Sequence, residues 1–155
     1  MKNLSLYVIL LSIVFFSACG GGSTGQAEQA KAPNPPKVVD PYESWQQNHG
    51  IGPVKAFTLP TEIDQELATS GKAIYETKCT ACHKPDKKFI GPAPKDILSR
   101  RTPAWIMNMI LVPDKMIIED PIAKKLLMEF NGAPMANQNL KEDEARALLE
   151  YFRTL

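Results

Sequence analysis

Cys79-Thr80-Ala81-Cys82-His83 is the stretch of sequence that decides the fold of this chain. Two cysteines with two residues between them, followed at once by a histidine, form the attachment signature of c-type haem. Each thiol can form a thioether with one vinyl group of the porphyrin, and His83 then supplies a neutral imidazole to one axial position of the iron. The stretch predicts one covalent haem c, with Cys79 and Cys82 as its thioether residues and His83 as its proximal ligand.

Two other uses of this motif fit the rest of the chain less well. A zinc site needs a second pair of ligands, and the only other histidine and cysteine, His49 and Cys19, lie far upstream. His49 falls in a polar turn beside a glycine, where a surface position is expected. A redox dithiol of the thioredoxin type needs a preceding strand and a βαβ unit, and neither is found in the sequence. Haem attachment is therefore the preferred interpretation.

Length and charge limit the remaining possibilities. With 155 residues, 44% of them hydrophobic, the chain is long enough for one ordinary domain plus targeting and linker sequence. Its formal net charge of +1 at pH 7 includes Lys2, so a processed chain would be near neutral. This argues against a nucleic-acid binder that relies on bulk charge.

Residues 1–18 have the features of an export signal, with Lys2 near the start and an apolar run up to Phe16. Ser17-Ala18-Cys19 looks like a bacterial lipobox, in which cleavage precedes a lipidated cysteine, although Phe16 replaces the usual aliphatic residue. An ordinary cleaved signal and an uncleaved anchor are the alternatives. The run of about 13 apolar residues is short of the roughly 20 that span a bilayer. We expect a lipoprotein of the cell envelope, lipid-anchored through Cys19 to a membrane and facing the periplasm.

The remainder of the chain divides into three predicted parts. Residues 19–37 are rich in glycine, serine and proline and are expected to form a flexible tether. Residues 38–60 are expected to form an extended arm packed on the domain. They carry too many large apolar side chains for a free linker, namely Tyr42, Trp45, Ile51 and Phe57. Residues 61–155 are expected to form the folded domain.

The pattern of this domain predicts an all-α fold, because apolar residues recur at helical spacing and no alternating strand pattern is found. A first helix is expected to begin near Thr61–Asp64 and to run into the haem motif, and a last helix covers 142–154. A short helix is expected over 94–100. Thr102-Pro103 and Asp120-Pro121 each supply a cap followed by a first-turn proline. We expect three to five helices around the haem.

With these features the chain resembles a class I monohaem cytochrome c. The residues that carry the resemblance are the haem motif with Gly71, Tyr75, Gly91-Pro92, Leu148 and Tyr151. The resemblance covers about Asp64 to Leu155 and implies the cytochrome c fold. It implies that Gly71 lets the first and last helices cross closely, and that the Pro92 carbonyl accepts a hydrogen bond from the proximal imidazole. The arm and core together resemble lipoprotein cytochromes of Bacteroidetes-type bacteria, some linked to nitrous oxide respiration.

The sixth ligand of the iron decides the function, and the sequence offers several methionines for it. Met107, Met109 and Met128 fall inside helical stripes, where methionine more often fills a core. Met116 lies in a stretch expected to be a loop. Met135 lies in a helix-free loop before the last helix, where the resemblance implies the distal methionine. The family more often places a proline after this methionine, whereas here the proline precedes it. We expect Met135 to be the distal axial ligand.

An iron with both axial positions filled has no room for a small-molecule substrate. We therefore expect an electron carrier rather than an enzyme, cycling between Fe(II) and Fe(III) among membrane or periplasmic respiratory partners. A terminal reductase such as nitrous oxide reductase is an example of an acceptor. If the sixth position is open, the alternatives are a peroxidase-like haem enzyme and a haem-based gas or redox sensor.

Basic residues crowd the segment after the haem motif, at Lys84, Lys87, Lys88, Lys95, Arg100 and Arg101. A basic rim around an exposed haem edge would steer a redox partner with an acidic docking surface. The alternative is an ordinary solvated face. Arg100, Arg101 and Trp105 are also candidates for binding a haem propionate, and the sequence does not choose among them.

Overall fold

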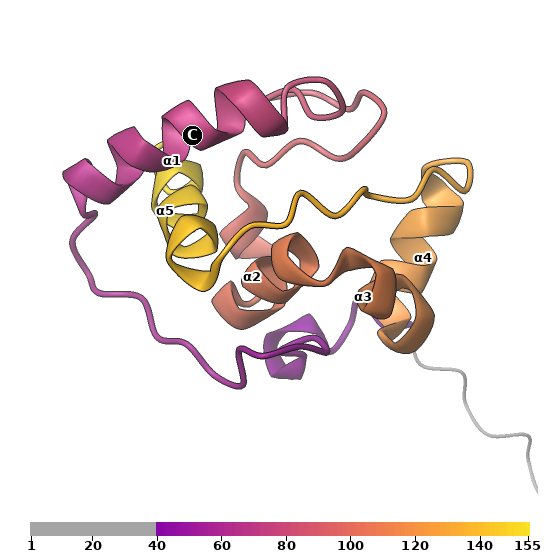
Figure 1. Cartoon of the computed structure of the whole chain (residues 1–155). Helices are drawn as coiled ribbons and strands as arrows, with labels where there is room; N and C mark the ends of the chain where they lie inside the picture. The colour runs from indigo at the N-terminus through magenta and orange to yellow at the C-terminus, as the bar shows by residue number, and fades with distance from the viewer. Residues whose placement is uncertain (1–39) are drawn as a thin grey trace, which may run out of the picture. The chain divides into compact units, whose positions relative to one another are not determined.

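The computed structural model describes residues 40–155, so the predicted signal at 1–18, Cys19 and the tether at 19–37 lie outside the described residues. Between residues 40 and 155 there are five α-helices and no β-strand, which confirms the all-α prediction. The helices are α1 (Gln65–Lys78), α2 (Pro103–Leu111), α3 (Pro113–Glu119), α4 (Pro121–Glu129) and α5 (Glu142–Phe152) (Figure 1). None of these helices is long and apolar enough to cross a bilayer.

Side-chain caps set where three of the helices begin. The Asp64 carboxylate accepts hydrogen bonds from the backbone N–H groups of Glu66 and Leu67, so α1 begins directly after Asp64 and not at Thr61. The predicted caps of α2 and α4 are both present. The Thr102 hydroxyl accepts from Trp105 N at 3.2 Å, and Asp120 accepts from Ala123 N at 2.8 Å. Each of these caps is followed by a first-turn proline, as predicted.

Two predicted elements differ from the structure. Within 94–100 only Ile97–Ser99 is helical, and as a 3-10 turn, because Asp96 before it adopts a left-handed φ of 56° that an α-helix does not tolerate. The stretch expected to be a loop after Pro113 is helix α3. Proline suits the first position of a helix because its missing N–H would have no intrahelical partner there. Met116 therefore lies on a helix and is fully buried.

Helix α1 crosses α5 at very close range (Figure 1). A Cβ at Gly71 would lie 2.0 Å from the backbone oxygen of Ala147, so only glycine fits at the crossing. One turn further along α1, the ring of Tyr75 lies 5.3 Å from that of Tyr151 and 6.1 Å from that of Phe152, measured between centroids. Helix α2 packs on α5 and α3, and α3 packs on α4. Side chains buried in the resulting core include Ile106, Met107, Ile110, Ile122, Leu148 and Leu149.

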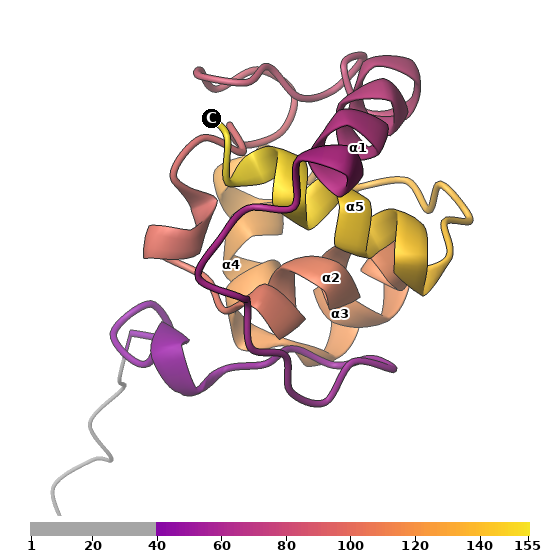
Figure 2. The same ribbon diagram turned by 90° about the vertical axis from the view of Figure 1, so that its left-hand side faces the viewer.

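The arm lies on the side of the helices opposite α1, as the indigo segment in Figures 1 and 2 shows. Its irregular backbone is held by polar side chains of the helical core. The buried Asn108 amide donates to the carbonyls of His49 and Val54 at 2.9 and 2.8 Å and accepts from Val54 N at 3.1 Å. Asn48 donates to Asp120 at 2.7 Å. The three Asn108 bonds satisfy backbone groups of the arm that would otherwise lack partners.

Candidate functional site

An apolar cavity of about 180 Å³ lies between the loop after α1, the helices α2 and α4, and the loop between α4 and α5. It is far larger than the roughly 10–15 Å³ that holds one water molecule. Its walls are mainly aliphatic and aromatic and include Ile97, Trp105, Ile106, Leu126, Phe130 and Leu148. The predicted site residues Cys79, Cys82, His83 and Met135 all line this one cavity.

The end of α1 turns the motif toward the cavity. Cys79 caps α1, and the backbone N–H groups of Cys82 and His83 both donate to the Cys79 carbonyl, at 3.1 and 2.9 Å. This tight turn lets both cysteines line the same cavity. Neither thiol is in a disulfide. Burial raises the pKa of Cys79 to about 11, so its thiol carries its proton at neutral pH.

Two contacts hold the ring of His83, and a third holds its backbone. Its Nδ1 lies 2.7 Å from the carbonyl oxygen of Pro92, which is the contact expected of that carbonyl. A carbonyl can only accept, so Nδ1 carries the proton and Nε2 keeps a free lone pair. Gly91 lies against the ring, since a Cβ there would come within 2.4 Å of His83 Cε1. The Tyr75 hydroxyl donates to the His83 carbonyl at 2.9 Å, a contact that no local pattern in the sequence indicates.

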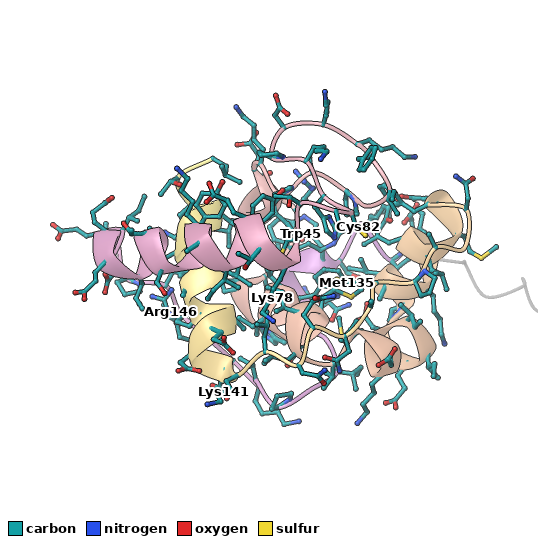
Figure 3. The ribbon with its side chains drawn as sticks, turned by 45° about the horizontal axis from the view of Figure 1, so that its top comes forward. Trp45, Lys78, Cys82, Met135, Lys141 and Arg146 are labelled. Carbon is teal, nitrogen blue, oxygen red and sulfur yellow. The ribbon has the colours of Figure 1, made fainter. Side chains whose placement is uncertain are left out.

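Met135 belongs to the loop between α4 and α5 and lines the same cavity as the motif. Figure 3 shows Cys82 and Met135 on two separate loops that border the same space. His49, by contrast, is exposed on the arm and does not line the cavity. In the part of the chain that the structure describes, no group of three His, Cys, Asp or Glu residues could hold a metal ion without a cofactor.

The structure separates the other methionines. Met107 and Met116 are buried in the core. Met128 is 76% exposed, so the prediction that it fills the core was wrong: it faces outward on α4. Met109, on α2, is half-buried and lines the cavity together with Met135. Two methionines therefore line the cavity, Met109 and Met135, and for Met109 the sequence pattern predicts a place in the core.

Arg101 is the buried one of the three cations that line the cavity, and no acidic side chain of the described residues forms an ion pair with it. The Arg100 guanidinium donates to two backbone carbonyls at 2.7 and 3.0 Å, and the Trp105 indole N–H donates to Asp120 at 3.0 Å. Arg101 is only 6% exposed, so it does not belong to the exposed basic rim that the sequence predicted. None of the ion pairs among residues 40–155 involves it. Burial lowers the pKa of Arg101, and a buried cation of this kind calls for an anionic ligand.

These features fit haem c. Two free thiols and an imidazole with an available Nε2 line one apolar cavity, and a methionine from a separate loop lines it as well. The apolar walls suit a flat macrocycle, and the buried guanidinium suits one of its carboxylates.

Comparisons with known proteins agree with this chemistry. Residues 68–155 match the family model of cytochrome c. The solved structure of cytochrome c from Rhodothermus marinus is similar, with 47% sequence identity and a TM-score of 0.64 over 66% of this chain and 88% of that chain. An engineered form of it, Rma TDE, matches at 46% identity and a TM-score of 0.64 over 66% and 89%. Rma TDE bound to a carbene intermediate matches at 46% identity and a TM-score of 0.61 over 66% and 88%. A comparison with curated proteins gives no significant match.

Proposed function

Because this chain belongs to the cytochrome c family, we propose that it carries single electrons between respiratory partners on one covalent haem c. Haem c supplies an iron that alternates between Fe(II) and Fe(III). The observation that carries the proposal is that one apolar cavity is lined by the two thiols and His83 from the loop after α1 and by Met135 from the loop between α4 and α5. Such a site supports electron transfer without a place for a substrate at the iron.

We assign each residue a role in holding the haem. With haem c bound, Cys79 and Cys82 would form the thioethers, and the iron would be held by His83 as its proximal ligand and Met135 as its distal ligand. The Pro92 carbonyl orients the His83 ring through the 2.7 Å contact at Nδ1. The apolar walls exclude water, and the rigid core keeps the geometry the same in both oxidation states.

Arg101 is assigned to a haem propionate. Arg100 and Trp105, the other candidates from the sequence, donate to partners within the protein; Arg101 donates only its Nη1 to the Arg100 carbonyl among the described residues, which leaves its remaining N–H groups for a ligand. Arg101 lines the cavity, is buried and has no ion-pair partner among the described residues. A guanidinium in this position can bind a carboxylate through charge-assisted hydrogen bonds.

The partner is proposed to be a redox protein with an acidic docking surface. Beside the motif, Phe89 and Ile90 are 51% and 49% exposed, and Ile90 also lines the cavity. Lys84 lies 5.0 Å from the centre of the Phe89 ring, and Lys87 and Lys88 are exposed in the same loop. This exposed apolar patch near the cavity, with lysines around it, supports transient docking of a partner with an acidic surface. The acceptor is proposed to be a terminal reductase such as nitrous oxide reductase, on the family resemblance.

The chain is further proposed to be a lipoprotein of the cell envelope, held to a membrane through Cys19 and facing the periplasm. The support is the apolar run followed by Ser17-Ala18-Cys19, together with a haem type that bacteria attach outside the cytoplasm. The mass of the N-terminal peptide from membrane-extracted protein tests this: cleavage before Cys19 with added acyl chains supports it, and an unmodified Cys19 overturns it.

The electron-carrier proposal is tested on the reduced holoprotein with carbon monoxide and two small oxidants. We expect no rapid carbon monoxide binding. We expect oxidation by anionic ferricyanide to slow as salt is added, because a basic surface attracts the anion and salt screens that attraction. Oxidation by a cationic cobalt complex should show the opposite trend. Rapid carbon monoxide binding would contradict the carrier proposal, and matching salt trends for the two oxidants would contradict the basic docking surface.

Gly91→Ala is expected to disturb the proximal ligand. The added Cβ would lie 2.4 Å from His83 Cε1, and the ring cannot turn away while Nδ1 is bonded to Pro92. We expect a lower yield of holoprotein and a loss of about 1–3 kcal/mol in its free energy of unfolding, as for other overpacked sites. Phe89→Ala is the control, because this exposed side chain lies in the same loop without lining the cavity. Wild-type yield and stability in Gly91→Ala would contradict the predicted contact.

A further inference from the structure

The arm approaches the haem cavity through Tyr42, which with Trp45 lines a second cavity beside it. The ring of Tyr42 has two cations close to it: the Arg101 guanidinium carbon at 4.6 Å and the Lys125 ammonium at 4.0 Å from the ring centre. Lys125 also pairs with Asp40 at 2.6 Å, which ties the start of the arm to α4. Residues 40–60 precede the part of the chain that matches the family model, so this contact is an addition to the family domain.

Arg101 is held between two aromatic rings. Its guanidinium carbon lies 5.2 Å from the centre of the Trp105 ring, on α2, and 4.6 Å from that of Tyr42. Trp105 is fixed in turn, since its indole N–H donates to the buried Asp120. Of the two aromatic neighbours of Arg101, Trp105 belongs to the helical core and Tyr42 belongs to the arm.

A second cavity continues the haem cavity at this point. It shares Pro92, Arg100, Arg101, Leu126 and Phe130 with the first, and Tyr42, Trp45 and Glu129 complete its wall. Arg101 therefore lies where the two cavities join, and the arm side chains separate it from solvent. Glu129 is exposed, so water screens its carboxylate more than it screens the buried guanidinium.

We propose that Tyr42 is a positioning residue that keeps the Arg101 guanidinium dehydrated at the edge of the haem cavity and thereby raises the reduction potential of the iron. A cation in a dry site acts on a nearby charge more strongly than one in water. A positive charge near the iron disfavours Fe(III), which carries one more positive charge than Fe(II). Without the Tyr42 ring, water reaches Arg101 and this effect weakens. The inference rests on the haem site and not on any partner.

The test is an equilibrium redox titration of the full-length holoprotein, which requires no partner and no activity assay. Tyr42→Leu is expected to lower the midpoint potential. Tyr42→Phe, which keeps the ring, should retain the wild-type value. Arg101→Gln should lower the potential at least as far as Tyr42→Leu. In the Arg101→Gln background, Tyr42→Leu should have no further effect, because the residue through which it acts is gone.

Phe57→Leu is the matched control. Phe57 is another arm aromatic stacked on an arginine, with Arg146 4.8 Å from its ring centre, but neither residue lines either cavity. Its potential should stay at the wild-type value. An unchanged midpoint potential in folded Tyr42→Leu overturns the proposal. It is also overturned if Tyr42→Leu lowers the potential of Arg101→Gln as much as it lowers that of the wild type. If Arg101→Gln does not fold, Arg101→Lys takes its place as the background for Tyr42→Leu. In that background, a fall in potential as large as in the wild type would contradict the proposal that Tyr42 acts through the Arg101 guanidinium. Such a failure leaves electron transfer intact, whereas rapid carbon monoxide binding would defeat the proposed function itself.

Discussion

Met135→Ala is expected to open the sixth position of the iron, so that the reduced holoprotein binds carbon monoxide at once. The oxidised variant should lose the weak red charge-transfer band that sulfur ligation produces. Its reduction potential should fall by a substantial part of the roughly 0.8 V range that axial ligands span, because a thioether sulfur favours Fe(II). The reason lies in the fold: Met135, from the loop between α4 and α5, lines the same cavity as the motif.

Met109→Ala is the matched control for this assignment. Met109 also lines the cavity and carries the same thioether, but it is on α2 rather than in the loop. We expect this variant to keep the red band, to resist carbon monoxide and to change in potential only slightly. Absorption spectra of both oxidation states, with and without carbon monoxide, decide between the two residues. If Met109→Ala loses the band and Met135→Ala keeps it, the distal ligand is Met109.

Gly71→Val is expected to prevent the close crossing of α1 and α5. Already the first added carbon would lie 2.0 Å from the oxygen and 2.4 Å from the carbonyl carbon of Ala147. These are backbone atoms of a helix, which cannot rotate away as a side chain can, so the two helices must separate. We expect a loss of about 3 kcal/mol or more in the free energy of unfolding of the holoprotein, the upper end of the range for overpacked sites. Denaturant titration followed by circular dichroism measures it.

Gly71→Ala sharpens the same test because two effects oppose each other in it. Alanine improves helix propensity by about 1 kcal/mol over glycine, which would stabilise α1. The contact with Ala147 acts the other way and should dominate. Ser70→Ala is the control, since Ser70 is exposed on the same helix and the substitution should change stability by no more than about 0.5 kcal/mol. A Gly71→Ala variant as stable as the wild type would mean that the helices can yield at this crossing.

Short-range sequence patterns correctly predicted where α2 and α4 begin, because each has a capping side chain directly before it. Thr102-Pro103 and Asp120-Pro121 begin α2 and α4 as predicted, because both the capping side chain and the proline act on backbone groups a few residues away. Helix α3 was missed because Val112 before it offers no capping side chain. Pro113 fits the end of the preceding helix as well as the start of α3. Proline is found both after a helix and at the start of one, and the tertiary contacts decide which.

The identity of the cofactor follows from the sequence, whereas the way the cavity is closed follows only from the tertiary structure. Cys79, Cys82 and His83 lie within one turn, so their spacing is enough to indicate covalent haem attachment. The burial of Arg101 and its contact with Tyr42 join residues 59 positions apart (101 − 42). The bond from the Tyr75 hydroxyl to the His83 carbonyl joins residues only eight positions apart, but it too depends on how α1 meets the loop after it. Such contacts come from packing between elements, and packing has no period or motif that a local pattern can reveal.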